Sequence, residues 1–130
     1  MAERIEKYEG QFFQGVLDEI EKELAQKQNV AVAIEGNSGA GKSDLAGWIA
    51  ERCDCNVIHM DDFFLQPHQR TEKRLRQTGG NIDYERFQSE VADHLKGGRE
   101  FRYQIYDCHR AALTDAVHVV PKRLTVVEGV

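Results

Sequence analysis

A short run of β-favouring apolar residues that leads straight into a glycine-rich segment constrains the fold of this chain more than any other feature. Residues 30–34 are Val-Ala-Val-Ala-Ile, a pattern typical of a strand buried on both faces of a parallel sheet. Residues 36–41 are Gly-Asn-Ser-Gly-Ala-Gly, which is a loop composition. A helix is expected next, because Leu45, Ile49 and Cys53 share one helical face. The sequence therefore predicts a strand, a loop and a helix in direct succession, as in α/β folds.

The glycine-rich segment matches the pattern G-x-x-x-x-G-K-[ST], which is typical of phosphate-binding loops. Its residues are Gly36, Asn37, Ser38, Gly39, Ala40, Gly41, Lys42 and Ser43. The glycines let the backbone curl until several N–H groups face one set of phosphate oxygens, and the start of the next helix adds partial positive charge. Lys42 is expected to reach the β- and γ-phosphates of a nucleotide, and Ser43 to bind Mg²⁺. Binding of a nucleoside triphosphate is therefore the firmest prediction.

Periodic patterns before and after this unit extend the prediction. Apolar side chains at steps of three and four predict an N-terminal helix with a charged outer face. They are Ile5, Tyr8, Phe12, Phe13, Val16, Leu17, Ile20 and Leu24. Residues 56–60 predict a second strand, and residues 61–81 show no clear period and predict a long loop.

The last part of the chain is predicted to form a third helix, a hairpin and one more strand. The helix is marked by Tyr84, Phe87, Val91 and Leu95, and Gly97 and Gly98 close it. Residues 101–106 and 116–120 predict two short strands of a hairpin, and residues 124–128 predict a buried strand.

This order of helices and strands predicts an α/β fold with a parallel sheet. We expect one domain, with an N-terminal helix in residues 1–28, core strands and the phosphate loop in 29–60, a substrate-side insert in 61–122 and a core strand in 123–130. Because Val130 follows an apolar strand so closely, we also expect a truncated chain whose sheet is incomplete at the C-terminus.

Composition and charge exclude several functions. The net charge is −5, which argues against a general nucleic-acid binder. The longest apolar run, residues 30–34, is far shorter than the ~20 residues that span a bilayer, and the N-terminus lacks an apolar signal core. The three cysteines do not suggest a disulfide framework or a zinc site. We therefore expect a cytoplasmic protein with neither nucleic-acid nor membrane partners.

Phosphate loops of this kind occur in switch GTPases, motor-type ATPases and small-molecule kinases. The guanine-reading pattern N-K-x-D does not occur in the sequence, and the last strand ends in Glu128 rather than in the Asp or Asp-Glu of a motor ATPase. A kinase needs an acidic residue at the carboxyl end of a strand, where open α/β sheets bind their ligands. Asp61 stands there, directly after the second predicted strand.

From about residue 29 to residue 130 the sequence resembles the uridine kinase-like branch of the P-loop kinases, which includes phosphoribulokinase and bacterial pantothenate kinase. The resemblance rests on the phosphate loop and four short motifs in the family's order. These are Asp61-Asp62-Phe63-Phe64, Asn81-Ile82-Asp83, Tyr106-Asp107-Cys108-His109-Arg110 and Glu128-Gly129. It implies a three-layer P-loop fold and an activity that transfers the γ-phosphoryl group of ATP to a hydroxyl of a small molecule.

The resemblance also implies a role for each matched residue. Asp61 would accept or orient the proton of the acceptor hydroxyl, and Glu128 would hold Mg²⁺ through water. Asp83 would bind sugar hydroxyls. Tyr106 and His109 would face the nucleobase or its equivalent.

Other interpretations remain open for several residues. Asp83 precedes a predicted helix and also fits an N-cap, and Tyr106 also fits strand packing. Asp62 is either a solvated neighbour or a second metal contact, and the sequence does not decide what Arg70 and Arg74 do. Phe63 and Phe64 are expected to pack rather than to stack on a ligand, and His59, His68, His94 and His118 are expected to be ordinary surface or core side chains.

Members of the family continue beyond the Glu-Gly strand with an arginine-rich lid, to which nothing in this sequence corresponds. We therefore expect this chain to keep the phosphate site but to transfer phosphate poorly. An unpaired edge of the sheet predicts a homo-oligomer. The alternative functions are a nucleotide-binding module without transfer activity, and a P-loop kinase for another acceptor such as pantothenate or a sugar phosphate.

Overall fold

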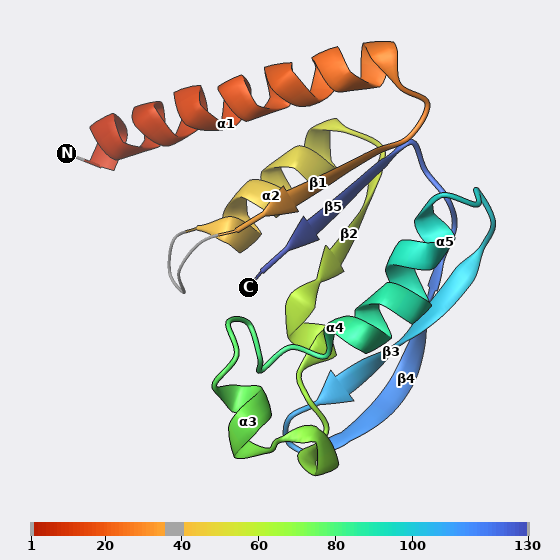
Figure 1. Ribbon diagram of the computed structural model, residues 1–130. Helices are drawn as coiled ribbons and strands as arrows, with labels where there is room; N and C mark the ends of the chain where they lie inside the picture. The colour runs from red at the N-terminus through yellow and green to blue at the C-terminus, as the bar shows by residue number, and fades with distance from the viewer. Residues whose placement is uncertain (1, 36–40, 130) are drawn as a thin grey trace.

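The computed structural model describes residues 2–35 and 41–129, with the backbone alone for residues 2–10 and Ser43. Figure 1 shows a parallel sheet, a separate hairpin, and helices around both. The elements in chain order are α1 (Ala2–Gln26), β1 (Val30–Ile34), α2 (Lys42–Arg52), β2 (Cys55–His59), η1 (Met60–Phe63), η2 (Pro67–Gln69), α3 (Glu72–Leu75), α4 (Tyr84–Phe87), η3 (Gln88–Ala92), α5 (Asp93–Leu95), β3 (Phe101–Asp107), β4 (Ala112–Val119) and β5 (Leu124–Glu128).

The parallel sheet has the strand order β1-β5-β2, so that the last strand of the chain lies between the first two (Figure 1). Ile34 and His59 are both register partners of Glu128, which aligns the carboxyl ends of all three strands. The Gly129 N–H donates to the Ile34 carbonyl oxygen at 3.1 Å. Gly129 has φ +117°, and a Cβ there would lie 3.1 Å from the Cβ of Met60, so this close passage favours glycine. The predicted α/β class with a parallel sheet and a hairpin is confirmed.

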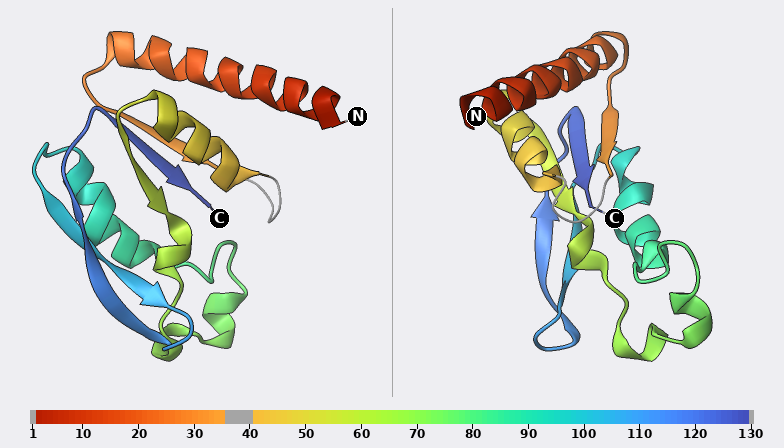
Figure 2. Two further views of the ribbon diagram at one scale, coloured as in Figure 1. Left: turned by 180° about the vertical axis from the view of Figure 1, so that it is seen from behind. Right: turned by 90° about the vertical axis from the view of Figure 1, so that its left-hand side faces the viewer.

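Helices α1 and α2 cover one face of the sheet and enclose what we call the first core (Figure 2). Its buried residues are Ile20, Val30, Ile34, Leu45, Ala46, Ile49, Leu124 and Val126. The Phe13 ring of α1 meets the Trp48 ring of α2 edge-on, with centroids 5.6 Å apart. Of the periodic positions that predicted the two helices, Ile20, Leu45 and Ile49 are buried here, whereas Phe12 is 63% exposed and the side chains of Ile5 and Tyr8 lie outside the described residues.

The run from α4 to α5 lies on the other side of the sheet and, with η1 and the β3–β4 hairpin, encloses the second core (Figure 2). Its buried residues are Ile58, Met60, Phe63, Ile82, Val91, Phe101, Tyr103 and Val119. Phe63 is fully buried, and its ring lies 5.2 Å from that of Phe87 and 5.3 Å from that of Tyr103. The expected packing role of Phe63 is confirmed.

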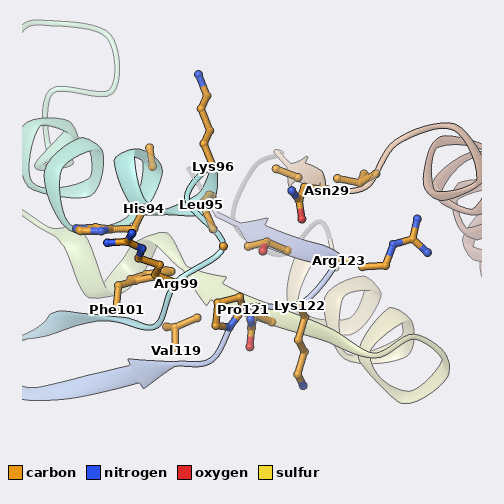
Figure 3. A pocket seen from close by; sticks show the side chains of 16 residues that line it. Asn29, His94, Leu95, Lys96, Arg99, Phe101, Val119, Pro121, Lys122 and Arg123 are labelled. Atoms are coloured by element: carbon orange, nitrogen blue, oxygen red, sulfur yellow. The ribbon is translucent and has the colours of Figure 1, made fainter.

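The prediction that β1 is buried on both faces is wrong. Ala31 and Ala33 are exposed, and a cavity of about 410 Å³ lies against Ala31, between the sheet and α5 (Figure 3). The second layer of helices covers β2 instead, where Ile58 is 1% exposed. A short apolar run cannot by itself distinguish these two degrees of burial.

The prediction of one long loop in residues 61–81, which rested on their lack of a clear period, is wrong. Pro67 begins η2, and a capping box closes its N-terminus: the Gln66 side chain accepts from the Gln69 N–H, and the Gln66 N–H donates to the Gln69 side chain at 2.9 Å. The Thr71 side chain accepts a hydrogen bond from the Arg74 N–H and caps α3. These turns are too short to show a helical period, so local capping residues define them instead.

The strand boundaries also differ from those expected. Strand β2 covers residues 55–59 rather than 56–60, and Met60 belongs to η1. Strand β4 begins at Ala112 rather than at residue 116, so the hairpin is longer than predicted. The pairing shifts between Gln104 and Tyr106, and this irregularity interrupts the alternation that marks a strand in the sequence.

The predicted third helix is one continuous helical run, but its middle is a wide π turn, η3 (Figure 1). Asp83 caps its N-terminus, because its Oδ1 accepts a hydrogen bond from the Arg86 N–H at 3.1 Å. The N-cap interpretation of Asp83 is confirmed. Across residues 2–35 and 41–129, every helix is too short or too polar to cross a membrane.

Candidate active site

The described part of the predicted phosphate loop is its last part, at the start of α2. Gly41 is the N-cap of α2 with φ 82°, a left-handed conformation that favours glycine, and its carbonyl oxygen accepts the first helical hydrogen bond, from Leu45 at 3.0 Å. Lys42 is half-buried in the first turn. The predicted loop residues Gly36, Asn37, Ser38, Gly39 and Ala40 and the side chain of Ser43 lie outside the described residues, so their roles stay predictions.

A group of carboxylates lies at the carboxyl ends of β2 and β5. Glu128 ends β5 and is 5% exposed, and Asp61 and Asp62 lie in η1, directly after β2. Burial raises the pKa of the Asp62 carboxyl above its ordinary value; the nearby His59 and Arg86 oppose this rise, and the negative Asp61 and Glu128 add to it. The structure therefore brings Asp61, Asp62 and Glu128 together at one edge of the sheet.

His59 is part of this group, although its sequence context suggested an ordinary histidine. Its Nδ1 lies 2.5 Å from Oε1 of Glu128, and the two residues are direct partners in the β2–β5 register. They are 69 positions apart in the chain, so only the strand order brings them together. No local sequence signal contains this information.

Arg86 fixes the turn that carries the two aspartates. Its Nη2 donates to the Asp62 carbonyl oxygen and its Nη1 to the Gln104 carbonyl oxygen, both at 2.6 Å. The guanidinium lies 4.3 Å from the centroid of the Phe63 ring and 3.8 Å from an oxygen of Asp83. This 8% exposed arginine thus ties η1 to the hairpin and to the start of α4.

Asp83 faces Arg86 rather than solvent. It is 2% exposed, its side chain caps α4, and its backbone N–H donates to the Phe63 carbonyl oxygen at 2.7 Å. A role of Asp83 toward sugar hydroxyls stays a prediction.

The two arginines that the sequence left undecided differ in the structure. Arg74 donates from Nε to the Gly80 carbonyl oxygen at 3.1 Å and from Nη2 to the Ile82 carbonyl oxygen at 2.9 Å, and it pairs with both oxygens of Glu85. Its guanidinium therefore holds the segment before α4 in place. Arg70 is exposed.

Tyr106 and His109 lie at the hairpin end, not at the carboxyl ends of the parallel strands. Tyr106 is half-buried in β3, and His109 is exposed in the turn. The Asp107 carboxylate accepts hydrogen bonds from the His109 N–H at 2.8 Å and from the Arg110 N–H at 3.3 Å, which shapes this turn. Contact of Tyr106 or His109 with an acceptor stays a prediction.

The cavity beside Ala31 is a separate feature at the amino ends of the strands. Its lining includes Lys96, Arg99, Lys122 and Arg123. Figure 3 shows Lys96 and Lys122 pointing in opposite directions and Arg123 pointing away from both. Arg123 donates to the Gln28 and Lys27 carbonyl oxygens after α1, and Lys122 pairs with Asp54 at 2.9 Å. These cations therefore do not converge on one ligand.

By its fold, the chain is similar to solved structures that carry the names of kinases. Neither a scan against protein-family models nor a search of curated proteins gave a match. Among solved structures, it is similar to a provisionally named uridine kinase from Bacillus stearothermophilus, with a TM-score of 0.64, 19% identity and 79% of this chain covered. It is also similar to a provisionally named fructose transport system kinase from Silicibacter sp., with a TM-score of 0.65, 28% identity and 91% covered.

These similarities confirm the expected resemblance to uridine kinase-like P-loop kinases at the level of the fold. The chain spans 61% of the length of each of the two structures. Both neighbours carry the name of a kinase, one of uridine and the other of a fructose transport system.

Proposed function

We propose that this chain is an ATP-dependent phosphotransferase that moves the γ-phosphoryl group to a hydroxyl of a small molecule. The observation that carries this proposal is the common edge of the three parallel strands. There a lysine-bearing, glycine-capped helix follows β1, and Asp61, Asp62 and Glu128 stand at or just after the ends of β2 and β5. In this proposal residues 29–60 and 123–130 bind the nucleotide, and residues 61–122 face the acceptor.

The carboxylates of this edge fit Mg²⁺. Within residues 2–35 and 41–129, no group of three or more His, Cys, Asp or Glu side chains is arranged to hold a metal ion alone. Mg²⁺ in kinases is usually held by one or two carboxylates together with substrate phosphates and water, so a closed protein cage is not required. Glu128 would hold the ion through water, and the bound ion would neutralise charge on the β- and γ-phosphates.

The transfer itself needs little covalent chemistry from the protein. Lys42 and the N–H groups at the start of α2 would bind the triphosphate and stabilise its negative charge. The exposed Asp61 would accept the proton of the acceptor hydroxyl as the acceptor oxygen bonds to the γ-phosphorus and the bond to the β–γ bridging oxygen breaks, releasing ADP. The partly buried Asp62 is less accessible to an acceptor, so we assign the proton to Asp61.

The acceptor class is the open part of the proposal. The names of the two similar structures refer to uridine and to fructose transport, which supports a small hydroxylated molecule without choosing between them. Asp83, Tyr106 and His109 are the candidates for acceptor contacts, and a nucleoside, pantothenate and a sugar phosphate are the acceptors to screen.

Nucleotide binding is tested first, by calorimetric titration of the chain with ATP in the presence of MgCl₂. We expect binding that Lys42→Ala weakens about 10- to 100-fold, because it removes a charged donor to the phosphates. Lys96→Ala is the matched control, since Lys96 is exposed at the opposite end of the sheet. Equal binding by the wild-type and Lys42→Ala chains would contradict the proposal.

Transfer is tested by single-turnover assays with γ-labelled ATP and the acceptor panel. We expect Asp61→Asn to lower the rate about 10²- to 10⁴-fold while ATP affinity stays within twofold. Asp115→Asn, on the exposed face of the hairpin, should change neither quantity. If the wild-type chain binds ATP but labels no acceptor, the second candidate, a nucleotide-binding module, replaces the kinase.

A further inference from the structure

The contact between His59 and Glu128 joins a half-exposed side chain to a nearly buried one. The two side chains are 50% and 7% exposed, and the separation between Nδ1 and Oε1 is 2.5 Å. The contact uses one particular ring nitrogen of His59 and one particular oxygen of Glu128. The ring is therefore one of the groups that orient the Glu128 carboxylate.

The backbone supports this contact. His59 and Glu128 are register partners at the last position of the β2–β5 ladder, and the preceding pair, Ile58 and Val127, belongs to or packs against the second core. Partners in a parallel pair place their side chains on the same face of the sheet. The ladder thus keeps the Cα atoms of the two residues beside one another and their side chains on the same face of the sheet.

The acidic surroundings of Glu128 suggest a role for its contact with His59. Asp61 and Asp62 follow His59 within three positions, in η1, directly after the strand that is paired with β5. Like charges repel, so a hydrogen bond from His59 helps to hold the Glu128 carboxylate in place beside its acidic neighbours. Groups that hold metal ions are commonly oriented by such outer hydrogen bonds.

We propose that His59 is a positioning residue for magnesium: its Nδ1–H holds Oε1 of Glu128 and so helps to orient this carboxylate toward the water shell of the nucleotide-bound Mg²⁺. This inference rests on the proposed function, because it assumes that ATP binds at this edge with Mg²⁺. It adds a residue to that site that the sequence motifs do not include.

The geometry gives a sharp set of variants. In asparagine the side-chain nitrogen takes about the place of histidine Nδ1, and in glutamine about the place of Nε2. His59→Asn should therefore keep the hydrogen bond to Glu128, whereas His59→Gln and His59→Ala should lose it. His118→Ala is the matched control, because His118 pairs with Glu100 at 3.0 Å on a surface away from the parallel sheet.

The experiment titrates MgCl₂ into the chain at fixed ATP and measures binding by calorimetry, with ATP in EDTA as the metal-free reference. Mg²⁺ is expected to increase the affinity for ATP. We expect His59→Ala and His59→Gln to raise the Mg²⁺ concentration that gives half of this increase about three- to tenfold. The effect is smaller than for residues that orient a direct metal ligand, because Glu128 would act through water. His59→Asn and His118→Ala should stay within twofold of wild type. Metal-free ATP affinity should not change in any variant.

Two results would overturn the inference while leaving the proposed function intact: an unchanged Mg²⁺ requirement in both His59→Ala and His59→Gln, or a His59→Asn variant as impaired as His59→Ala. If His59→Ala does not fold, as metal-free ATP binding will reveal, His59→Gln provides the comparison. A wild-type chain that binds no ATP at any Mg²⁺ concentration would overturn the proposed function and this inference together.

Discussion

The two cores of this molecule are built in different ways. The first core lies between the sheet and two long helices, α1 with 25 residues and α2 with 11, and its buried members are all apolar. The second core is bordered by the short turn η1, by the β3–β4 hairpin and by the continuous helical run from α4 to α5 with its wide π turn, and the charged pair of Arg86 and Asp83 is buried beside it. The proposed phosphate side is thus built from regular elements packed by apolar side chains, whereas hydrogen bonds from arginine side chains hold the acceptor side together.

The difference has a physical reason. Helical segments of four residues are unstable on their own, because nucleation costs more than so few hydrogen bonds return. The segment from η1 to α4 is instead fastened by the guanidinium groups of Arg74 and Arg86, which donate to carbonyl oxygens across the turns. Such hydrogen bonds fix the conformation of the segment without a large buried apolar surface, so the loss of either arginine should destabilise it.

The largest expected effect on stability comes from removing the guanidinium group of Arg86. Arg86→Met should lower the free energy of unfolding by about 3–5 kcal/mol, because it leaves Asp83 buried without its counter-charge and the Asp62 and Gln104 carbonyl oxygens without donors. Urea unfolding measures the loss. Amide hydrogen exchange should accelerate first in the second core, at residues such as Val91.

The control for this change is Arg110→Met in the hairpin turn. Arg110 is 77% exposed and lies 3.9 Å from Asp107, so its loss should change stability by less than about 0.5 kcal/mol. A loss below about 1 kcal/mol in Arg86→Met would show that the second core does not depend on its buried arginine.

A smaller effect concerns the pH dependence of the second core. Burial, with a contribution from the negative Asp62, raises the pKa of Tyr103 from its ordinary value of 10.0 to about 12. The unfolded chain therefore releases this proton first as pH rises, and stability that is complete below pH ~10 is lost toward pH ~12, by about 2 kcal/mol. Urea unfolding of the wild type at several pH values across this window measures the loss.

Tyr103→Phe isolates this effect, because it keeps the ring and removes the titrating hydroxyl. The variant should share the alkaline loss caused by other groups but lack the part due to Tyr103. Identical slopes of stability against pH in the two proteins would contradict the assignment.

The smallest expected effect on stability concerns α2, one of the two helices that border the first core. Gly47 is exposed in α2, and a Cβ there would meet nothing within 4 Å. Gly47→Ala should therefore stabilise the chain by about 0.5–1 kcal/mol through helix propensity alone. Thermal unfolding would show a higher midpoint, whereas Ala50→Gly, on an exposed position of the same helix, should lower it.

The same contrast explains what the sequence could predict. The helices of the first core and the strand β1 before the glycine-rich segment follow from patterns within a few neighbouring residues, and these elements are confirmed, whereas the loop itself lies outside the described residues. Arg86 was missed because an arginine in a sequence suggests a solvated position, and the short turns of residues 61–81 are below the length at which a period exists. The contact of His59 with Glu128 depends on strand order, which no local pattern contains.

The wide turn η3 gives the chain a tolerance in length. A π turn holds one residue more than an ordinary helical turn. Deleting one residue within Gln88–Ala92 would return the run to a regular helix and leave Arg86 before it and Leu95 after it on their present faces. The same deletion elsewhere in the run would rotate everything beyond it by about 100°. Related chains can therefore differ by one residue at this point without rebuilding what lies on either side.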